Sequence, residues 1–307
     1  MRKMNDATNW LLPNGISSNN AIVIDRRAGN VFSKVESSRM TNFLDTAVVA
    51  AHAAGAILRE KLGKVGYREK SRADLVTEAD VMAQRTIEDI ILTAFPDHYF
   101  LGEESQGKTP SFGDEFDTRV QDRMLSEDQC GSRAPEDKPY TWVVDPLDGT
   151  TNFVHRVPFF CTSIALARGN ELLCAALYNP NTDELFTAEK GKGAYLNGAR
   201  IHASSETDAQ HTLMAISYET EARSDSPDTI AFQRCVTVCQ ALRRTGSTAL
   251  NLAYVASGRF DAMTCQSAHP WDVAAGVLLL KEAGGVATNT NGEPFDLANQ
   301  PLLASAN

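Results

Sequence analysis

The sequence predicts an α+β protein, built as a layered sandwich of helices and sheets with substantial antiparallel pairing. Two observations support this prediction. Apolar residues recur at helical spacing toward both ends of the chain. In the middle, residues 160–203 alternate β-rich segments with turns that read RGNE, NPNTDE and KGKG. Such closely spaced turns are typical of hairpins, so these strands are expected to form an antiparallel meander.

The first elements follow from helical spacing and helix-ending residues. Apolar residues recur over 44–62, Thr41 stands at the N-cap position, and Gly63 follows the last turn. A second helix is expected over about 78–94, because apolar residues repeat there and a proline lies beyond its end. The stretch HYFL at 98–101 then predicts a short strand.

The second half of the chain is read in the same way. The stretch YTWVVD at 140–145 predicts a buried strand, and helical patterns return near 228–240, 247–257 and 272–283. Residues 106–139 are polar, with Gly, Pro, Asp and Glu spread through them. They predict a long irregular insertion, a kind of segment that is usually functional or mobile.

Composition excludes several classes of protein. The chain has 307 residues, of which 43% are hydrophobic, enough for one large domain or two closely joined ones. The net charge of -10 argues against a nucleic-acid binder, because such proteins show a basic surface. No apolar run has the length that spans a membrane. The six cysteines include no Cys-x-x-Cys pair, which predicts reduced thiols in a cytoplasmic protein.

The folded domain is expected over residues 40–307, with the 106–139 insertion inside it. Residues 1–39 are polar, rich in Asn, Ser and Arg, and lack the apolar stretch of a signal peptide. Two interpretations of this extension stay open: it is a short capping segment, or translation starts at Met40.

Acidic residues stand at three places where a buried element meets a turn, which is where sites are usually built. The stretch VVDPLDGTTNF carries Asp145 and Asp148, Glu103 and Glu104 follow the strand at 98–101, and Asp272 opens an apolar helix. Each place alone has an ordinary explanation, since Asp-Pro and Asp-Gly are turn dipeptides and an acid at a helix start is a cap. Their recurrence suggests a shared site.

Adjacent carboxylates repel one another unless a cation bridges them. Hard cations such as Mg²⁺ take oxygen ligands and are held by a few carboxylates together with substrate phosphate. Glu103, Asp145, Asp148 and Asp272 would supply such a set, and the carbonyl of Leu147 could add an oxygen. Two Mg²⁺ ions would offset these four charges, and a phosphate dianion would leave room for a third ion.

Six stretches resemble one known family, in the same order along residues 41–300. They are ADLVTEAD (73–80), GEES (102–105), DPLDGTTNFVH (145–155), GKGAYLNG (191–198), RRTGSTALNLAYVASGRFD (243–261) and WDVAAG (271–276). The sequence resembles the inositol monophosphatase family of Mg²⁺-dependent, lithium-sensitive phosphatases. The resemblance implies a layered α/β/α/β/α sandwich of the sugar-phosphatase type and a homodimer.

The resemblance also implies which residues hold the ions. Glu103, Asp145 and the Leu147 carbonyl match the ligands of one ion, and Asp145, Asp148 and Asp272 match those of a second. Asp145 would bridge the two. Glu104, together with Glu103, lies where a third and weaker ion is approached, and it is counted among the catalytic residues.

For catalysis and substrate binding, the resemblance points to the residues that follow. Thr150 and Asp74 match the pair that polarises the attacking water, and Gly149 and Thr150 lie where backbone N–H groups hold the phosphate. Thr248 and Cys265 match substrate-contacting positions. Cys265 stands where the family usually has an inositol-contacting glutamate, so a blunted preference for inositol phosphates is expected.

The expected function is Mg²⁺-dependent hydrolysis of a small phosphate monoester, above all inositol-1-phosphate, by activated water attacking in line. The stretch NFVHRVPFF at 152–160 favours the inositol branch. The alternatives are a fructose-1,6-bisphosphatase, a 3'-phosphonucleotide phosphatase and a histidinol-phosphate phosphatase. A role of a different class also stays open, in which the protein binds to transcription complexes and has only weak phosphatase activity. His155 and His269 are expected to pack or form hydrogen bonds.

Overall fold

The computed structural model describes residues 42–71, 74–105, 139–218, 223–297 and 302–305. The expected extension over residues 1–39, and the expected insertion except for its last residue, lie outside the described residues. No helix of the described ranges is long and apolar enough to cross a membrane.

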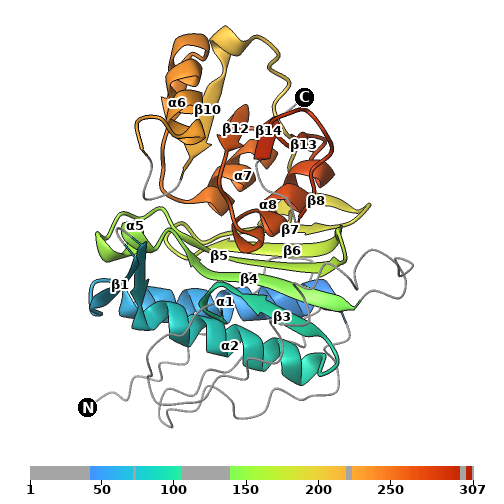
Figure 1. Cartoon of the computed structure of the whole chain (residues 1–307). Coiled ribbons are helices and arrows are strands. Elements are labelled where there is room, and N and C mark those ends of the chain that lie inside the picture. The colour runs from blue at the N-terminus through green and yellow to red at the C-terminus, as the bar shows by residue number, and fades with distance from the viewer. Residues whose placement is uncertain (1–41, 72–73, 106–138, 219–222, 298–301, 306–307) are drawn as a thin grey trace, which may run out of the picture.

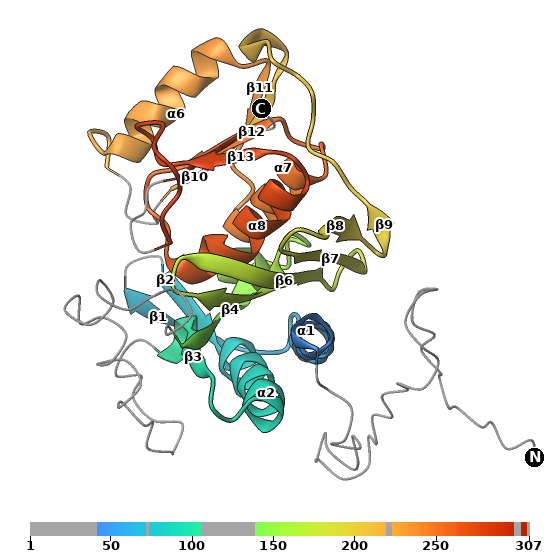
Figure 2. The same ribbon diagram turned by 90° about the vertical axis from the view of Figure 1, so that its right-hand side faces the viewer.

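Five layers make up the described fold (Figures 1 and 2). Helices α1 (Phe43–Lys61) and α2 (Glu78–Ala94) cover one face of a seven-stranded sheet. Helices α7 (Thr248–Ala256) and α8 (Pro270–Glu282) lie between this sheet and a five-stranded sheet, and α6 (Pro227–Val238) covers the far side. This order confirms the predicted layered sandwich.

The large sheet has the strand order β3-β4-β5-β6-β7-β8-β9. Its strands are β3 (Tyr99–Gly102), β4 (Tyr140–Asp148), β5 (Cys161–Arg168), β6 (Glu171–Asn179), β7 (Glu184–Glu189), β8 (Gly193–Leu196) and β9 (Ala199–Arg200). From β4 to β9 every pairing is antiparallel, which confirms the predicted meander, whereas β3 pairs with β4 in parallel.

The small sheet has the order β11-β10-β12-β14-β13. Its strands are β10 (Leu213–Ser217), β11 (Ala241–Arg243), β12 (Ala262–Cys265), β13 (Val286–Thr288) and β14 (Leu302–Ser305). Strand β10 pairs in parallel with β11 and β12, and β14 fits antiparallel between β12 and β13. A separate antiparallel pair, β1 (Tyr67–Ser71) and β2 (Asp74–Thr77), precedes α2.

The helix starts follow from their capping residues, and one differs from the prediction. Helix α1 is capped by Asn42, whose side chain accepts a hydrogen bond from the Leu44 N–H at 3.1 Å, so the prediction of Thr41 as N-cap was one residue early. Asn and Thr are both good caps, and spacing alone does not separate neighbours. Helix α2 has the expected bounds, with a capping box between Thr77 and Asp80.

Two hydrophobic cores lie on opposite faces of the large sheet, and β4 contributes to both. Trp142 and Val144 are fully buried against α1 and α2. Val143 points to the other core, which includes Leu250 of α7 and Leu279 of α8. Alternate residues of a strand point to opposite faces. The strand is therefore covered on both sides up to the acidic residues that end it.

Helix α8 is fixed at its end to the turn between β7 and β8. The two carboxylate oxygens of Glu282 accept the backbone N–H groups of Gly191 and Gly193 at 2.7 and 2.8 Å. This contact explains part of the GKGAYLNG stretch in structural terms, because the turn anchors the helix that begins near Asp272.

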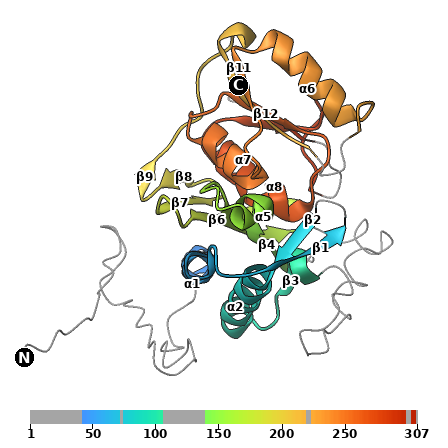
Figure 3. The ribbon, with the colours of Figure 1, turned by 90° about the vertical axis from the view of Figure 1, so that its left-hand side faces the viewer.

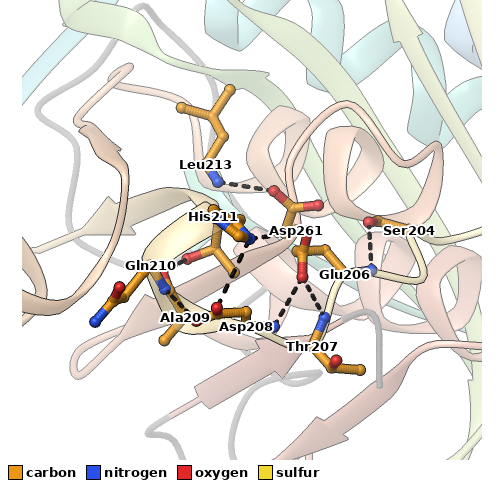
Figure 4. A network of polar contacts seen from close by, with 10 residues as sticks. Ser204, Glu206, Thr207, Asp208, Ala209, Gln210, His211, Leu213 and Asp261 are labelled. Atoms are coloured by element: carbon orange, nitrogen blue, oxygen red, sulfur yellow. Dashed lines mark hydrogen bonds and ion pairs between the residues drawn. The ribbon is translucent and has the colours of Figure 1, made fainter.

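The segment that crosses from the large sheet to the small one is held by short-range hydrogen bonds (Figure 4). Glu206 Oε1 accepts the N–H groups of Thr207 and Asp208, both at 2.8 Å. Asp261, ahead of β12, accepts the Leu213 N–H at 2.7 Å and so ties the start of β10 to its neighbouring strand.

Candidate active site

A bulge at the end of β4 places the first two acidic residues. Asp145 pairs with Ser163 and Asp148 pairs with Cys161, so β4 carries one more residue than β5 across this step. Proline has no N–H to give to a strand ladder, and Pro146 lies inside the bulge. The Leu147 N–H instead donates to Asp145 Oδ1 at 2.9 Å. Bulges commonly re-aim side chains next to active sites.

Asp148 is bound to the first turn of α7, one hundred residues further along the chain. Its Oδ2 accepts the Ala249 N–H at 2.7 Å and the hydroxyl of Ser247, which is the N-cap of α7. Its Oδ1 accepts the Thr248 N–H at 3.2 Å. The carboxylate thus satisfies N–H groups that have no partner within the helix, and it joins β4 to α7.

Carboxylates from the three acidic places predicted from the sequence lie close enough to repel one another. Burial raises the pKa of Asp145 well above its usual value, and the charges of Glu103, Asp148 and Asp272 raise it further. Burial likewise raises the pKa of Asp148 from 3.8 to about 6, although the hydrogen bonds from Ser247, Ala249 and Thr248 oppose the shift. We call Glu103, Asp145, Asp148 and Asp272 the acid cluster. The structure therefore brings together four residues that the sequence analysis grouped.

Glu103 and Glu104 are positioned by a glutamine that the sequence analysis missed. They lie in a 3₁₀ turn, Glu103–Ser105, directly after β3. Gln84 of α2 is 1% exposed; its Oε1 accepts the Glu104 N–H at 2.8 Å, and its Nε2 donates to the Ser105 hydroxyl at 3.0 Å. A Cβ at Gly102 would overlap the Gln84 side chain, so glycine is required there. The sequence did carry a signal for this role, because Gln84 is a polar residue on the apolar face of α2.

Thr150 lies beside Asp80, an aspartate that the sequence analysis did not single out. Its hydroxyl is 3.1 Å from Asp80 Oδ1 and 3.1 Å from the Leu147 carbonyl oxygen. Asp80 is fully buried, and its Oδ2 accepts the N–H and the hydroxyl of Thr77 at 2.9 and 2.5 Å. Asp74 begins β2, and its side chain lies outside the described part. The carboxylate next to Thr150 is thus Asp80, because the helix start at Thr77 turns this residue toward α5.

The turn after Asp148 requires glycine and is fixed by an asparagine. Gly149 has a φ of 100°, and a Cβ there would lie 3.1 Å from the Phe159 carbonyl oxygen. The helix α5 (Thr150–Val154) follows, next to β2 (Figure 3). Asn152, which the sequence analysis did not single out, donates to the carbonyl oxygens of Phe159 and Thr245 at 2.7 and 2.9 Å. It joins the loops on either side of the turn.

The two expected substrate-contacting residues differ in their surroundings. Thr248 is half-buried at the start of α7 and donates its N–H to Asp148. Cys265 is 1% exposed, and its thiol donates to the Ser267 carbonyl oxygen at 3.0 Å. Burial raises the pKa of this thiol, and Asp272 adds to the shift. Cys265 therefore lies near the acid cluster but is covered by protein.

The histidines that flank the motifs have ordinary surroundings. His269 is the N-cap of α8, and its ring stacks on Trp271 with centroids 4.7 Å apart, which agrees with the expected packing role. His155 ends α5, where its N–H donates to the Thr151 carbonyl oxygen at 3.1 Å.

The donor set of the acid cluster fits a hard cation. Its members are carboxylates, burial of Asp145 and the charges of its acidic neighbours raise the pKa of Asp145, and the largest causes of that shift include no positive charge. The carboxylates are not arranged as a ready ion cage, since no three His, Cys, Asp or Glu side chains of the described residues form one. Asp148 is directed to α7, and Asp272 Oδ2 accepts the His269 N–H at 2.8 Å.

Comparison with known proteins decides the family. The model of the inositol monophosphatase family matches residues 39–307. The chain belongs to the inositol monophosphatase family. Inositol monophosphatase 2 of Solanum lycopersicum is 39% identical over 270 residues, which cover 87% of this chain and 94% of that protein. The fructose-1,6-bisphosphatase/inositol-1-monophosphatase of Aquifex aeolicus is 34% identical over 264 residues, covering 85% and 90%.

Solved structures agree with this membership. The crystal structure of the extragenic suppressor protein suhB from Bartonella henselae superposes with a TM-score of 0.72 at 32% identity, covering 85% of this chain and 92% of that one. The protein is a phosphatase, a phosphoric monoester hydrolase, and its fold is similar to that of the Bartonella structure.

Proposed function

We propose that the protein is a Mg²⁺-dependent phosphatase of small polyol phosphates, with inositol-1-phosphate as its main substrate. The observation that carries this proposal is the acid cluster, in which Glu103, Asp145, Asp148 and Asp272 meet from three separate parts of the chain. Asp145 and Asp148 are buried, and Glu103 and Asp272 are half-buried. A group of like charges of this kind destabilises the fold unless it is neutralised by protons or by a cation.

Two ions, with a third held more weakly, are expected at these residues. One ion would be held by Glu103, Asp145 and the Leu147 carbonyl oxygen, and the other by Asp145, Asp148 and Asp272. Glu104 would approach the third. When bound, Mg²⁺ supplies positive charge that lowers the pKa of water and neutralises phosphate oxygens. Asp148 already accepts three hydrogen bonds at the start of α7. A carboxylate has about four acceptor sites, so Asp148 can keep these bonds and bind an ion through the remaining site.

The catalytic proton relay is proposed for Thr150 and Asp80. The Thr150 hydroxyl can accept a hydrogen bond from the attacking water while it donates to Asp80, whose Oδ1 lies 3.1 Å away. Asp80 is itself held in place by Thr77, so its orientation does not depend on substrate. The pair orients the water lone pair toward phosphorus.

The phosphate is proposed to lie at the turn of Gly149 and Thr150. This turn leads into α5, and the N–H groups at a helix start favour an anion. Asn152 holds the turn in place through two carbonyl oxygens. The alcohol part of the ester would then extend toward α7, where Thr248 lies, and toward the start of α8.

The Aquifex relative, whose name includes a fructose-1,6-bisphosphatase activity, supports a bisphosphatase as the second candidate. A sugar bisphosphate presents a second anionic group, whereas inositol-1-phosphate presents hydroxyls. One relative is named as a suppressor protein, so a binding role is kept as a further alternative. The net charge of -10 disfavours direct binding of nucleic acid in such a role. A cytoplasmic homodimer belongs to the same proposal.

The test is phosphate release from a panel of esters with Mg²⁺ and with EDTA. Inositol-1-phosphate should be hydrolysed with the highest kcat/KM, and fructose-1,6-bisphosphate more slowly. Asp145→Asn should abolish Mg²⁺-dependent release. Asp225→Asn, at an exposed acid just ahead of α6 that pairs with Arg223, should leave it unchanged. Equal activity of the parent in EDTA and in Mg²⁺ would contradict the proposal.

A further inference from the structure

A buried carboxylate outside the acid cluster holds the segment that leads into α8. Asp228 lies in the first turn of α6 and is 3% exposed. Its Oδ1 accepts the Gln266 N–H at 3.1 Å, and its Oδ2 accepts the Ser267 hydroxyl at 3.1 Å. A buried carboxylate is costly unless such bonds satisfy it. Both of its oxygens are therefore committed to the same short stretch of chain.

We call residues 266–269 the β12–α8 loop, because they join these two elements. At its beginning the Cys265 thiol donates to the Ser267 carbonyl oxygen at 3.0 Å. At its end the His269 N–H donates to Asp272 at 2.8 Å. The Gln266 side chain also donates to the Thr264 hydroxyl at 3.4 Å. Among the hydrogen bonds of the described residues that fix the loop, those to Asp228 come from another layer of the fold.

The loop lies between Asp228 and the acid cluster. Asp228 accepts hydrogen bonds from Gln266 and Ser267 at the start of the loop, and Asp272 of the acid cluster accepts the His269 N–H at its end. The loop has polar side chains, of which Gln266 is half-buried. Polar, partly exposed groups next to an ester-cleaving site can form hydrogen bonds with hydroxyls of the leaving alcohol.

We propose that Asp228 is a positioning residue, and that the β12–α8 loop which it fixes contacts the alcohol part of the substrate. This inference rests on the proposed function, and it assigns a role in substrate preference to a helix, α6, that lies in the outermost layer. The phosphate binds at the other end of the site, at the start of α5. Asp228 therefore affects recognition of the alcohol and leaves phosphate binding intact.

The physical reason is pre-organisation. With Asp228 present, the loop is ordered before substrate arrives; without it, the loop must be ordered when the ester binds, which weakens binding. The effect should be largest for an alcohol with many hydroxyls, such as inositol. It should be small for p-nitrophenyl phosphate, whose leaving group has no hydroxyl to place.

Three substitutions separate hydrogen bonding from charge. Asp228→Ala removes both bonds, and Ser267→Ala removes one. Asp228→Asn is the conservative variant, because its Oδ1 can accept from the Gln266 N–H while its NH₂ group donates to the Ser267 hydroxyl oxygen. The matched control is Asp225→Asn, an exposed aspartate just ahead of α6 that pairs with Arg223.

Two readouts are compared in these variants. In Asp228→Ala, KM for inositol-1-phosphate should rise about tenfold or more, while KM for p-nitrophenyl phosphate changes less than about twofold. Without substrate or Mg²⁺, hydrogen exchange of the Gln266 amide should become about tenfold faster. Asp228→Asn and Asp225→Asn should stay close to the parent in both measurements, and Ser267→Ala should show a smaller change in the same direction.

An Asp228→Ala protein that is folded and shows equal changes for both esters, or none, overturns the proposal. If this variant does not fold, Ser267→Ala decides: an unchanged ratio of the two KM values overturns the proposal as well. Failure of the proposed function would give a different result, a parent protein that hydrolyses neither ester. In that case hydrogen exchange of the Gln266 amide shows whether Asp228 fixes the loop.

Discussion

Replacing Asp148 by asparagine should stabilise the metal-free protein at neutral pH while it removes Mg²⁺-dependent activity. The pKa of Asp148 is raised to about 6 in the folded protein, from 3.8. A carboxyl of this kind binds its proton more tightly in the folded chain than in the unfolded one. Its contribution to stability is present below about pH 4 and is lost as the pH rises through about 6.

The magnitude follows from the two values. The difference between 3.8 and about 6 corresponds to about 3 kcal/mol of unfolding free energy that the ionised carboxylate costs at neutral pH. Asparagine avoids this cost but keeps one acceptor oxygen, and its NH₂ group must face donors at the start of α7. The loss of these bonds costs about 1–2 kcal/mol. The variant should therefore be more stable by about 1–2 kcal/mol.

The assay is urea unfolding in EDTA, followed for the parent, for Asp148→Asn and for the control Asp225→Asn. Between about pH 4.5 and pH 7.5 the parent should lose about 2 kcal/mol more than Asp148→Asn does. Added Mg²⁺ should stabilise the parent more than the variant, because an ion bound only to the folded state raises its stability. An Asp148→Asn protein that is less stable than the parent at neutral pH, with the same pH dependence, would refute the reasoning.

Three further outcomes are expected. Thr150→Ala and Asp80→Asn should each lower kcat by about 10²- to 10⁴-fold while Thr150→Ser keeps most of it; a rise in KM alone would assign Thr150 to substrate binding. Li⁺ at millimolar concentration should inhibit uncompetitively in steady-state assays, and complete insensitivity would favour the bisphosphatase-like alternatives. Cys265→Glu should lower the midpoint temperature of thermal unfolding, because it buries another carboxylate beside Asp272. An unchanged midpoint temperature, together with a higher preference for inositol-1-phosphate over glycerol-2-phosphate, would show that this position is open to substrate.

Sequence patterns predicted the elements whose signals are local. The bounds of α2 were predicted because periodic apolar residues and a proline mark them, and the structure confirms them. The antiparallel middle of the large sheet was predicted from turns, which are local as well. The grouping of Glu103, Asp145 and Asp272 was predicted from motifs, since spacing alone does not show that they meet.

Contacts between distant segments were not predictable in this way. The stretch ADLVTEAD contains Asp74 and Asp80, and only the turn from β2 into α2 decides that Asp80 reaches Thr150. A Thr-x-x-Asp capping pattern was present at that point and could have favoured Asp80. The bond of Asp148 to α7 spans one hundred residues, and no pattern in either segment indicates it.

Strand β14 is an inner strand of the small sheet, although it is synthesised after every other described strand. It alone joins β13 to β12. Until residues 302–305 leave the ribosome, β12 exposes one edge and β13 has no strand partner, so the nascent chain carries an unpaired edge of the kind that promotes aggregation. Yield of folded protein should thus depend more on late events in synthesis than on the early helices, and a fusion placed after β14 needs a linker long enough to let that strand insert.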